Sequence, residues 1–301
     1  MLHVTNGSSA GNLIARSGLE GDVLTWDDVL HEGPVPATVG PGALGQIRAW
    51  FLTTAGWGDY PTIVMKLAER DERLGEAVGK EPIVLWFEAD LYDQLQLLQV
   101  LDSLSEADDV TLVCIDAALG GLEPGRFPPL FETRQPVEQD EYELARRAWD
   151  AFCHTSPEAA DRLRAEDLSR LPYLADALTR LLQELPWSTD GLSRTERALL
   201  MPLYDGPRPF DEAFRAQMRA EERPFLGDTT ARWRLSLLAR GEHPLLTIRD
   251  ELALTGSGRR VLEAKLDAVE LRGIDRCLGG VTLSPEVDWR WDPLRGGPVL
   301  L

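Results

Sequence analysis

Residues 2–28 read LHVTNGSSAGNLIARSGLEGDVLTWDD, and this stretch decides the fold class. LHVTN (2–6) and DVLTWDD (22–28) are short β-rich runs typical of strands. Between them, the segment 8–18 opens with serines suited to an N-cap and ends at a glycine suited to a C-cap. A strand, a helix and a strand in this order predict the repeating unit of a mainly parallel sheet.

The same alternation continues to about residue 120. PIVLWFE (82–88) is a continuous apolar run of the kind that is buried on both faces of a sheet, and DVTLVCID (109–116) predicts a fourth strand. Helical patterns occupy the intervening segments, at 46–56, 60–78 and 90–104. We therefore expect residues 1–120 to form an α/β ligand-binding domain with a mostly parallel sheet and helices on both faces.

The chain changes character twice after residue 120. Residues 121–190 predict an irregular Gly/Pro-rich connection followed by a helical unit. Residues 191–301 predict three helices and then a two-stranded hairpin in HPLLTIRDELAL, with a further helix beginning near Ser257. Three helices and a hairpin are the layout of a winged helix, so we expect a winged-helix-like α+β domain at 191–301. Such domains bind DNA or serve as interaction modules.

Charge is distributed unevenly along the chain, whose formal net charge is −19. Residues 1–120 hold 19 acids and 6 bases, whereas residues 191–301 hold 17 of each. Because nucleic-acid binding needs basic surface, the charge argues against a nucleic-acid partner except through the C-terminal region. No apolar stretch approaches the length of a membrane span, the N-terminus lacks a signal-peptide pattern, and three separated cysteines form no framework. We expect a cytoplasmic protein with no membrane partner.

Polar residues follow each predicted strand. The carboxyl ends of parallel strands share one edge, and the loops that leave this edge form the ligand crevice. The edge is expected to gather a ligand-binding set, namely His3, Asn6, Gly7, Ser8, Ser9, Trp26, Asp27, Asp93 and Gln94. In TNGSSAG, free N–H groups and two hydroxyls would hold a phosphate or carboxylate, although an ordinary serine-capped turn explains the same residues. The segment is neither a Walker loop nor a G-x-G-x-x-G fingerprint.

Four polar residues are candidates for catalysis. His31 and Glu32 would act as an acid or base with its orienting partner, or would merely form a solvated loop. Glu88 and Asp90 end a buried strand, where a carboxylate needs donors, a cation or water. Together with Asp27 they would hold Mg²⁺, which is one candidate for a cofactor whose identity stays open. Alternatively, Asp90 would serve simply as a helix N-cap.

The chain resembles the bacterial family called domain of unknown function 1835. The resemblance rests on LHVTNGSSAG, WDDVLHEGPVP, WFEADLYDQLQLL and the C-terminal GIDRCLGGVTL with WRWD. It covers the first 120 residues best and departs from the family pattern at Ser8, where an acidic residue is usual. The resemblance implies the domain boundary and the choice of segments, and it implies no activity.

Two classes of function follow from these patterns. The first is binding of a small polar, phosphate-bearing ligand at the strand ends, with phosphoryl or acyl transfer as the reaction if the protein is an enzyme. The second is a ligand-sensing regulator or a protein-interaction module that acts through the C-terminal domain. Arginines 232, 234, 259 and 260 discriminate between them, because a regulator that binds DNA needs them on one exposed face.

Overall fold

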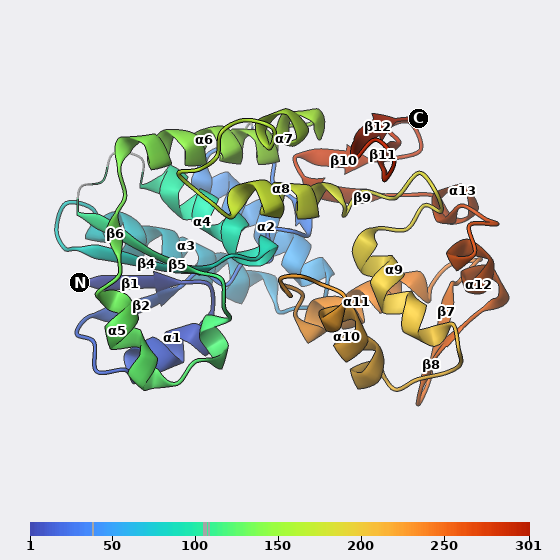
Figure 1. The fold of residues 1–301 in the computed structure, drawn as a ribbon, viewed down its shortest axis with the longest axis horizontal. Coiled ribbons are helices and arrows are strands. Elements are labelled where there is room, and N and C mark those ends of the chain that lie inside the picture. The colour runs from blue at the N-terminus through green and yellow to red at the C-terminus, as the bar shows by residue number, and fades with distance from the viewer. Residues whose placement is uncertain (38, 105–106, 108) are drawn as a thin grey trace.

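A five-stranded sheet forms the centre of the N-terminal part (Figure 1). The computed structural model describes residues 1–37, 39–104, 107 and 109–301. The strands of the sheet are β1 (Leu2–Thr5), β2 (Asp22–Thr25), β4 (Ile83–Glu88), β5 (Val110–Ile115) and β6 (Gln135–Pro136). Their order is β2-β1-β4-β5-β6, with the first four parallel and β6 antiparallel to β5. The four strands expected from the sequence are therefore present, and the sheet is mostly parallel.

Helices cover both faces of this sheet. Successive side chains of a strand point to opposite faces, so β4 contributes to two cores. Leu85 and Phe87 pack into the larger core with α4 (Leu91–Ser103) and α6 (Gln139–Cys153). Val84 and Trp86 pack into the smaller core with α1 (Ser8–Ala15) and α5 (Phe127–Phe131).

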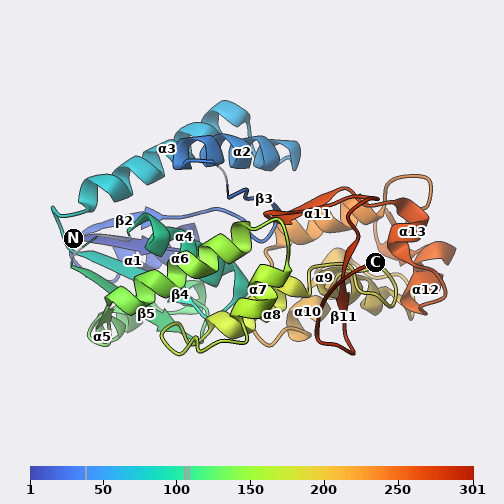
Figure 2. The same cartoon turned by 90° about the horizontal axis from the view of Figure 1, so that it is seen from above.

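Two further helices follow β2. These are α2 (Pro41–Thr54) and α3 (Tyr60–Ala77), which pack against each other and extend as a separate layer over one side of the sheet (Figure 2). Helix α2 begins earlier than the sequence indicates, within the Gly/Pro-rich stretch. Pro41 is tolerated there because the first helical residue has no intrahelical partner for its N–H group.

Helices and short strands make up the rest of the chain. The middle segment contains 3-10 turns at Leu119–Gly121 and Pro124–Arg126, then α6, α7 (Glu158–Leu163) and α8 (Leu174–Leu182). The last third contains α9 (Arg194–Leu200), a 3-10 turn (Met201–Leu203), α10 (Phe210–Arg219), α11 (Asp228–Leu238), β7 (Leu246–Ile248), β8 (Leu252–Leu254), α12 (Gly256–Leu262) and α13 (Ala268–Arg272). It ends with β9 (Arg276–Gly279), β10 (Val281–Leu283), β11 (Trp289–Asp292) and β12 (Gly297–Leu300). The pairs β7-β8, β9-β10 and β11-β12 are antiparallel.

A pairing between distant segments joins the two ends of the chain. The short strand β3 (Gly33–Pro34) runs parallel to β9 and completes a three-stranded sheet with β10. The larger core is likewise continuous from Leu2 in β1 to Trp291 in β11. The expected boundaries at residues 120 and 190 stay a prediction, since the apolar packing continues past both.

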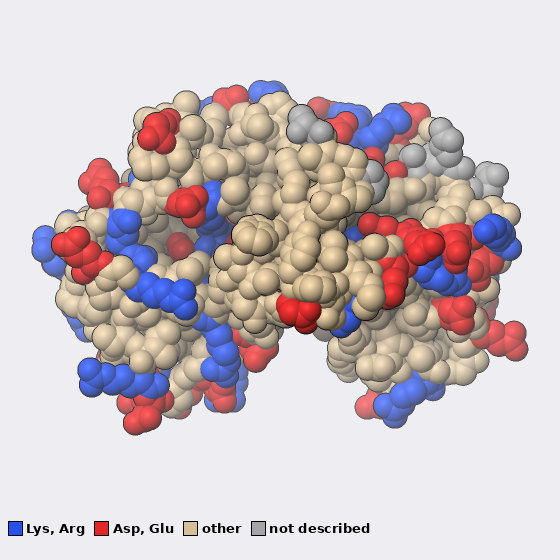
Figure 3. Space-filling model, turned by 180° about the vertical axis from the view of Figure 1, so that it is seen from behind, with Lys and Arg blue, Asp and Glu red and all other residues tan. Residues whose placement is uncertain are grey.

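The surface reflects the uneven charge of the sequence. Seen from behind, a group of acidic side chains lies over the half that holds the N-terminal sheet, and basic side chains are interspersed with acidic ones on both halves (Figure 3). Within the described residues, no helix combines the length and the apolar character needed to cross a membrane.

Candidate functional site

The strand order creates a crevice between β1 and β4. The chain leaves β1 through α1 on one face of the sheet and leaves β4 through α4 on the other. Loops that diverge in this way leave a gap at the carboxyl ends of the two strands, and ligands of open α/β sheets bind there. The residues that follow β1 and β4 are therefore the first candidates for a site.

Asn6 spans this crevice. Its side-chain amide donates to Glu88 Oε1 at 3.0 Å and to Asp93 Oδ2 at 2.8 Å. Its backbone oxygen accepts a hydrogen bond from the Tyr92 hydroxyl at 3.3 Å. The loop after β1 is thus tied to the acids that follow β4, as the sequence predicts from the shared edge.

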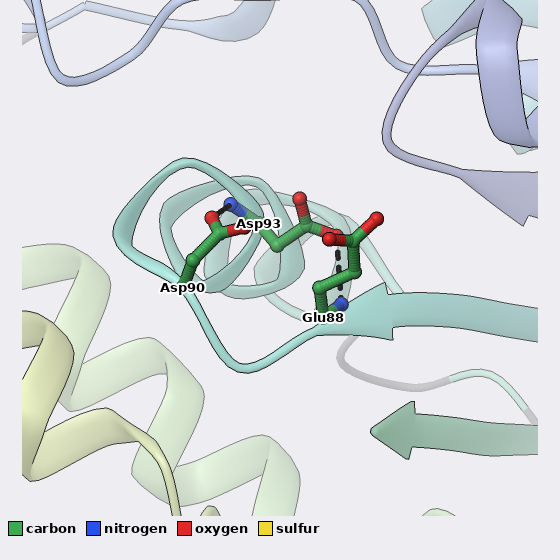
Figure 4. A group of neighbouring side chains, drawn as sticks. All are labelled: Glu88, Asp90 and Asp93. Atoms are coloured by element: carbon green, nitrogen blue, oxygen red, sulfur yellow. Dashed lines mark hydrogen bonds between the residues drawn. The ribbon is translucent and has the colours of Figure 1, made fainter. Parts of the chain in front are cut away.

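Three carboxylates form an acidic cluster at this point, namely Glu88, Asp90 and Asp93 (Figure 4). One oxygen from each lies within 4.8 Å of the others. The Glu88 N–H donates to Asp93 Oδ1 at 2.7 Å, and the Asp93 N–H donates to Asp90 Oδ1 at 3.0 Å, so Asp90 caps α4. Leu119 N–H donates to Glu88 Oε1 at 2.8 Å. The cluster is therefore held by backbone groups of three segments.

Burial makes the charge of the acidic cluster costly. Glu88, Asp90 and Asp93 are 9%, 8% and 1% exposed. Loss of hydration raises the pKa of Glu88, raises that of Asp90 to about 7 with help from the nearby Glu88 charge, and raises that of Asp93 well above its usual range. Within the described residues, no arginine or lysine forms an ion pair with any of the three. The negative charge is thus left to be neutralised by protons or by a bound cation.

The donor set suits a hard divalent cation. Carboxylate and amide oxygens are the ligands that Mg²⁺ and Ca²⁺ prefer, and Mg²⁺ commonly keeps sites open for water and phosphate oxygens. Asp93 takes the place that the sequence predicts for Asp27, whose carboxylate instead accepts the Thr25 hydroxyl at 2.6 Å. In this respect the expected cation ligands need correction.

A cavity of about 200 Å³ lies beside Asp90. Three arginines contribute to its wall: Arg180, Arg194 and Arg223. Each already has acidic partners, since Arg180 pairs with Glu184 and Glu221 at 2.7 Å, Arg194 with Glu221 at 3.3 Å, and Arg223 with Asp116 and Asp176 at 2.8 Å. The cavity accordingly offers both signs of charge at its surface.

The loop after β1 presents an open helix end. Gly7 is the N-cap of α1, and no side chain caps the helix, so its first N–H groups lack intrahelical partners. Ser8 and Ser9 are exposed in the first turn. This arrangement is compatible with the expected anion site at TNGSSAG.

A larger cavity of about 810 Å³ opens beside the same loop. Ser8, Trp26 and Asp27 lie in its wall. Trp26 is otherwise enclosed, with its indole N–H donating to Gln99 at 2.7 Å and Arg70 stacked 3.9 Å above its ring. The ligand-binding expectation for Ser8, Trp26 and Asp27 is thus compatible with their position.

His31 and Glu32 lie outside the hydrogen-bonded network of the acidic cluster, and their place at the same edge stays a prediction. Both are buried, and no hydrogen bond or ion pair of the described residues connects them to it. His31 packs edge-on against Tyr92 and Phe225, and its two ring nitrogens have no hydrogen-bond partner in the described chain. Burial lowers the pKa of His31 to about 3, so the ring is neutral near pH 7.

Glu32 belongs to a buried ionic network. Its carboxylate pairs with both Nε and Nη2 of Arg234 and lies 3.6 Å from Arg276. Arg276 also pairs with Glu184 at 3.2 Å. The geometry gives Glu32 a structural partner 202 residues away and no acid/base partner in His31.

The remaining predicted residues divide between the core and the site. His3 is fully buried, where Nδ1 accepts the Trp86 indole N–H at 3.1 Å and Nε2 lies 3.2 Å from the Glu20 carbonyl oxygen. Its ring therefore stabilises the smaller core and does not reach the carboxyl edge, contrary to expectation. Gln94 donates to the Glu88 backbone oxygen at 2.7 Å and so supports the acidic cluster from beneath.

Sequence reasoning missed several residues near the site. The three arginines beside Asp90 come from segments after residue 179, and nothing in their local pattern indicates the contact. Thr229 and Thr230, which border the larger cavity, fall in a segment whose pattern indicates only a helix. The available signal was the T-T pair directly after the Gly227 and Asp228 helix start.

Comparison of the chain with protein-family models gives no match. Comparison with curated proteins gives no match either.

Proposed function

We propose that the protein binds a divalent cation at Glu88, Asp90 and Asp93 and, beside it, a small polar, phosphate-bearing ligand. One observation carries the proposal: three buried carboxylates lie within 4.8 Å of one another, and among the described residues no cationic side chain pairs with them. A buried charge without a partner is strongly destabilising, and a divalent ion would replace the missing counter-charge.

The phosphate would lie between this cation and the first turn of α1. Asn6 contacts the acidic cluster and directly precedes Gly7, which leads into the uncapped helix end with Ser8 and Ser9. Uncapped helix N-termini bind anions, and Mg²⁺ is commonly shared between carboxylates and phosphate oxygens. These two preferences meet at the crevice between β1 and β4.

Phosphoryl transfer is the reaction class that such a site serves if the protein is an enzyme. A cation held by carboxylates neutralises charge on a transferring phosphoryl group and orients it. Acyl transfer through a thiol has less support, because burial raises the pKa of both Cys114 and Cys153 to about 12 and keeps them protonated.

The regulator hypothesis receives less support from the arginines. Arg234 is buried against Glu32, and Arg232 lies 3.7 Å from Asp211 and 3.9 Å from Asp228. Arg259 donates to the Tyr204 backbone oxygen. A winged-helix-like arrangement of α9, α10, α11 and the β7-β8 hairpin remains our proposal, with an interaction role favoured over DNA binding. The resemblance to domain of unknown function 1835 and the cytoplasmic location remain predictions.

Calorimetric titration of the full chain with MgCl₂ and MnCl₂ at pH 7.5 tests the cation site. We expect one ion to bind and protons to be released, because the pKa of Asp90 lies near the working pH. Asp90→Asn should abolish binding while keeping the helix cap, since asparagine is an equally good N-cap. Asp102→Asn, a partly buried acid on the same helix, is the matched control and should bind normally.

Inorganic phosphate then tests the second half of the proposal. Phosphate should stabilise the wild-type chain against heat only when Mg²⁺ is present, by about 2.7 kcal/mol at 100 times its Kd. Absence of cation binding by the wild-type chain, or equal binding by Asp90→Asn, contradicts the cation site. If Mg²⁺ binds but phosphate has no stabilising effect, the proposal of a phosphate-bearing ligand is contradicted.

A further inference from the structure

We infer that the 810 Å³ cavity beside Ser8 and Asp27 binds a nucleoside, with the ribose hydroxyls donating to Asp27. If the ligand is a nucleotide, the position of its phosphate rests on the function proposed above, and this inference names the ligand class of that site. Binding of the nucleoside part depends only on the cavity itself. A volume of this size falls in the range of small-molecule sites, and its wall is largely apolar with a few polar groups.

The carboxylate of Asp27 stands where a ribose acceptor is expected. In nucleotide-binding α/β folds, the phosphate lies at the N-terminus of the first helix, and an acid about 20 residues on, at the end of the second strand, accepts the ribose hydroxyls. Asp27 directly follows the end of β2 and Trp26, and its Oδ2 lies 3.5 Å from the hydroxyl of Ser8 in the first turn of α1. Its carboxylate oxygens have lone pairs that can accept further hydrogen bonds from a ligand.

The glycines of the first crossover have the packing roles that this geometry needs. A side chain at Gly11 would come within 2.7 Å of Thr25 Cγ2, so glycine lets α1 lie close against β2. A side chain at Gly7 would come within 3.1 Å of Asp27 Oδ1, so glycine leaves room where the helix end meets the carboxylate. The spacing differs from the G-x-G-x-x-G fingerprint, but close helix–strand approach is retained.

Another part of the cavity wall supplies an aromatic surface. Trp57 is fixed edge-on by Phe51 and Trp233, with ring centroids 6.0 and 5.4 Å away, and offers an apolar surface to a planar base. Thr230 lines the cavity and is 4% exposed, so its side chain faces the cavity from a largely buried position.

Charge favours a free nucleoside or nucleotide over a strand of nucleic acid. Residues 1–120 carry 13 more acids than bases, which repels a polyanion. Within the cavity, Lys66 makes no ion pair among the described residues and adds one positive charge to the wall. Arg70 and Arg73 are already paired, with Asp71 and with Asp22 and Glu81.

The test measures binding of adenosine, guanosine, cytidine and uridine to the full chain in EDTA, by calorimetry. Omitting the cation and the phosphate separates this inference from the function proposed above. We expect at least one nucleoside to bind, and its 2′-deoxy analogue to bind about tenfold more weakly, because a charge-assisted hydrogen bond is lost.

Asp27→Asn should weaken binding of the same nucleoside about tenfold or more. Asp109→Asn is the matched control, because Asp27 and Asp109 both have a positive φ, of 38° and 60°, which asparagine tolerates equally. Thr229→Trp, at an exposed position on the cavity wall, should fill the space and abolish binding without disturbing the core.

Three outcomes overturn the inference: no nucleoside binds at millimolar concentration, Asp27→Asn binds like the wild-type chain, or the 2′-deoxy analogue binds equally well. Binding that depends on Asp27 and is blocked by Thr229→Trp supports it. If that binding persists while Mg²⁺ fails to tighten the matching 5′-monophosphate, the cation function fails and the nucleoside site stands.

Discussion

Asn6 and Asp93 are joined by a 2.8 Å hydrogen bond although 87 positions separate them in the chain. The same amide donates to Glu88, so one side chain fixes the distance between the loop after β1 and the acids after β4. Two sections of the sheet edge are thereby held in one geometry before any ligand arrives. Such prior ordering reduces the entropy that binding would otherwise cost.

Stability should depend on pH through Asp90. Folding raises its pKa from 3.8 to about 7, so the folded chain holds a proton that the unfolded chain has lost. The stabilisation of the folded chain by this proton is fully present below about pH 4 and is lost as the pH rises to about 7. It amounts to about 4 kcal/mol. In EDTA, urea unfolding should therefore show that the free energy of unfolding of Asp90→Asn rises relative to that of the wild-type chain between about pH 4 and about pH 8. Parallel curves would contradict the raised pKa, and excess Mg²⁺ should remove the difference.

Glu32→Gln should destabilise the protein by about 3–5 kcal/mol. The exchange leaves Arg234 and Arg276 buried without their shared counter-charge, which is the costly way to break a buried ion pair. Urea unfolding at pH 7 measures the loss. Arg232→Gln is the control, because its acidic partners are exposed and its guanidinium stacks on Phe210 at the surface, so the exchange should cost less than about 1 kcal/mol. A fully stable Glu32→Gln chain would make Glu32 a candidate acid again.

Gly11→Ala should cost about 1–3 kcal/mol, because the added methyl group would meet Thr25 Cγ2 at 2.7 Å. Thr25→Ser removes that methyl group while keeping the hydroxyl that donates to Asp27. The double variant should therefore recover most of the loss, and a double-mutant cycle measures the coupling. Simple additivity of the two changes would show that α1 and β2 do not meet here.

His31 should produce a pH dependence of the opposite sign. Burial lowers its pKa from 6.5 to about 3, so the unfolded chain takes up a proton that the folded chain refuses. Stability is then lost as the pH falls from about 6.5 toward 3, by an amount on the order of 5 kcal/mol. His31→Phe should show a shallower loss than the wild-type chain in acid unfolding, whereas His243→Gln, at an exposed position, should follow the wild-type slope. Identical slopes for all three chains would rule out a neutral buried ring.

Local patterns predict the parts of this fold that local forces determine. The four parallel strands and most helices follow from apolar runs, helical spacing and caps such as Asp90 and Ser193. The shared carboxyl edge then brings Asn6, Glu88 and Asp93 together without knowledge of the strand order. Convergence of this kind is a property of every parallel sheet.

The errors concern residues whose partners lie far away in the chain. His31 and Glu32 look like an acid/base pair in the sequence, but Phe225 and Arg234 bury them. The two-residue strand Gly33–Pro34 has no periodicity from which its pairing with β9 could be predicted. His3 alternates correctly in β1, yet only the structure shows that Trp86 and Glu20 occupy both its nitrogens.

The pairing of β3 with β9 cannot form until nearly the whole chain has been synthesised. During translation, Gly33 and Glu32 emerge from the ribosome long before Arg276 and Leu278 exist to receive them. Until then β3 has no strand to pair with and the Glu32 carboxylate lacks its Arg276 partner, and an incompletely paired state of this kind is prone to misassembly. A chain that ends before residue 276 would never acquire β9 or Arg276, so such fragments are natural targets for chaperones and proteases.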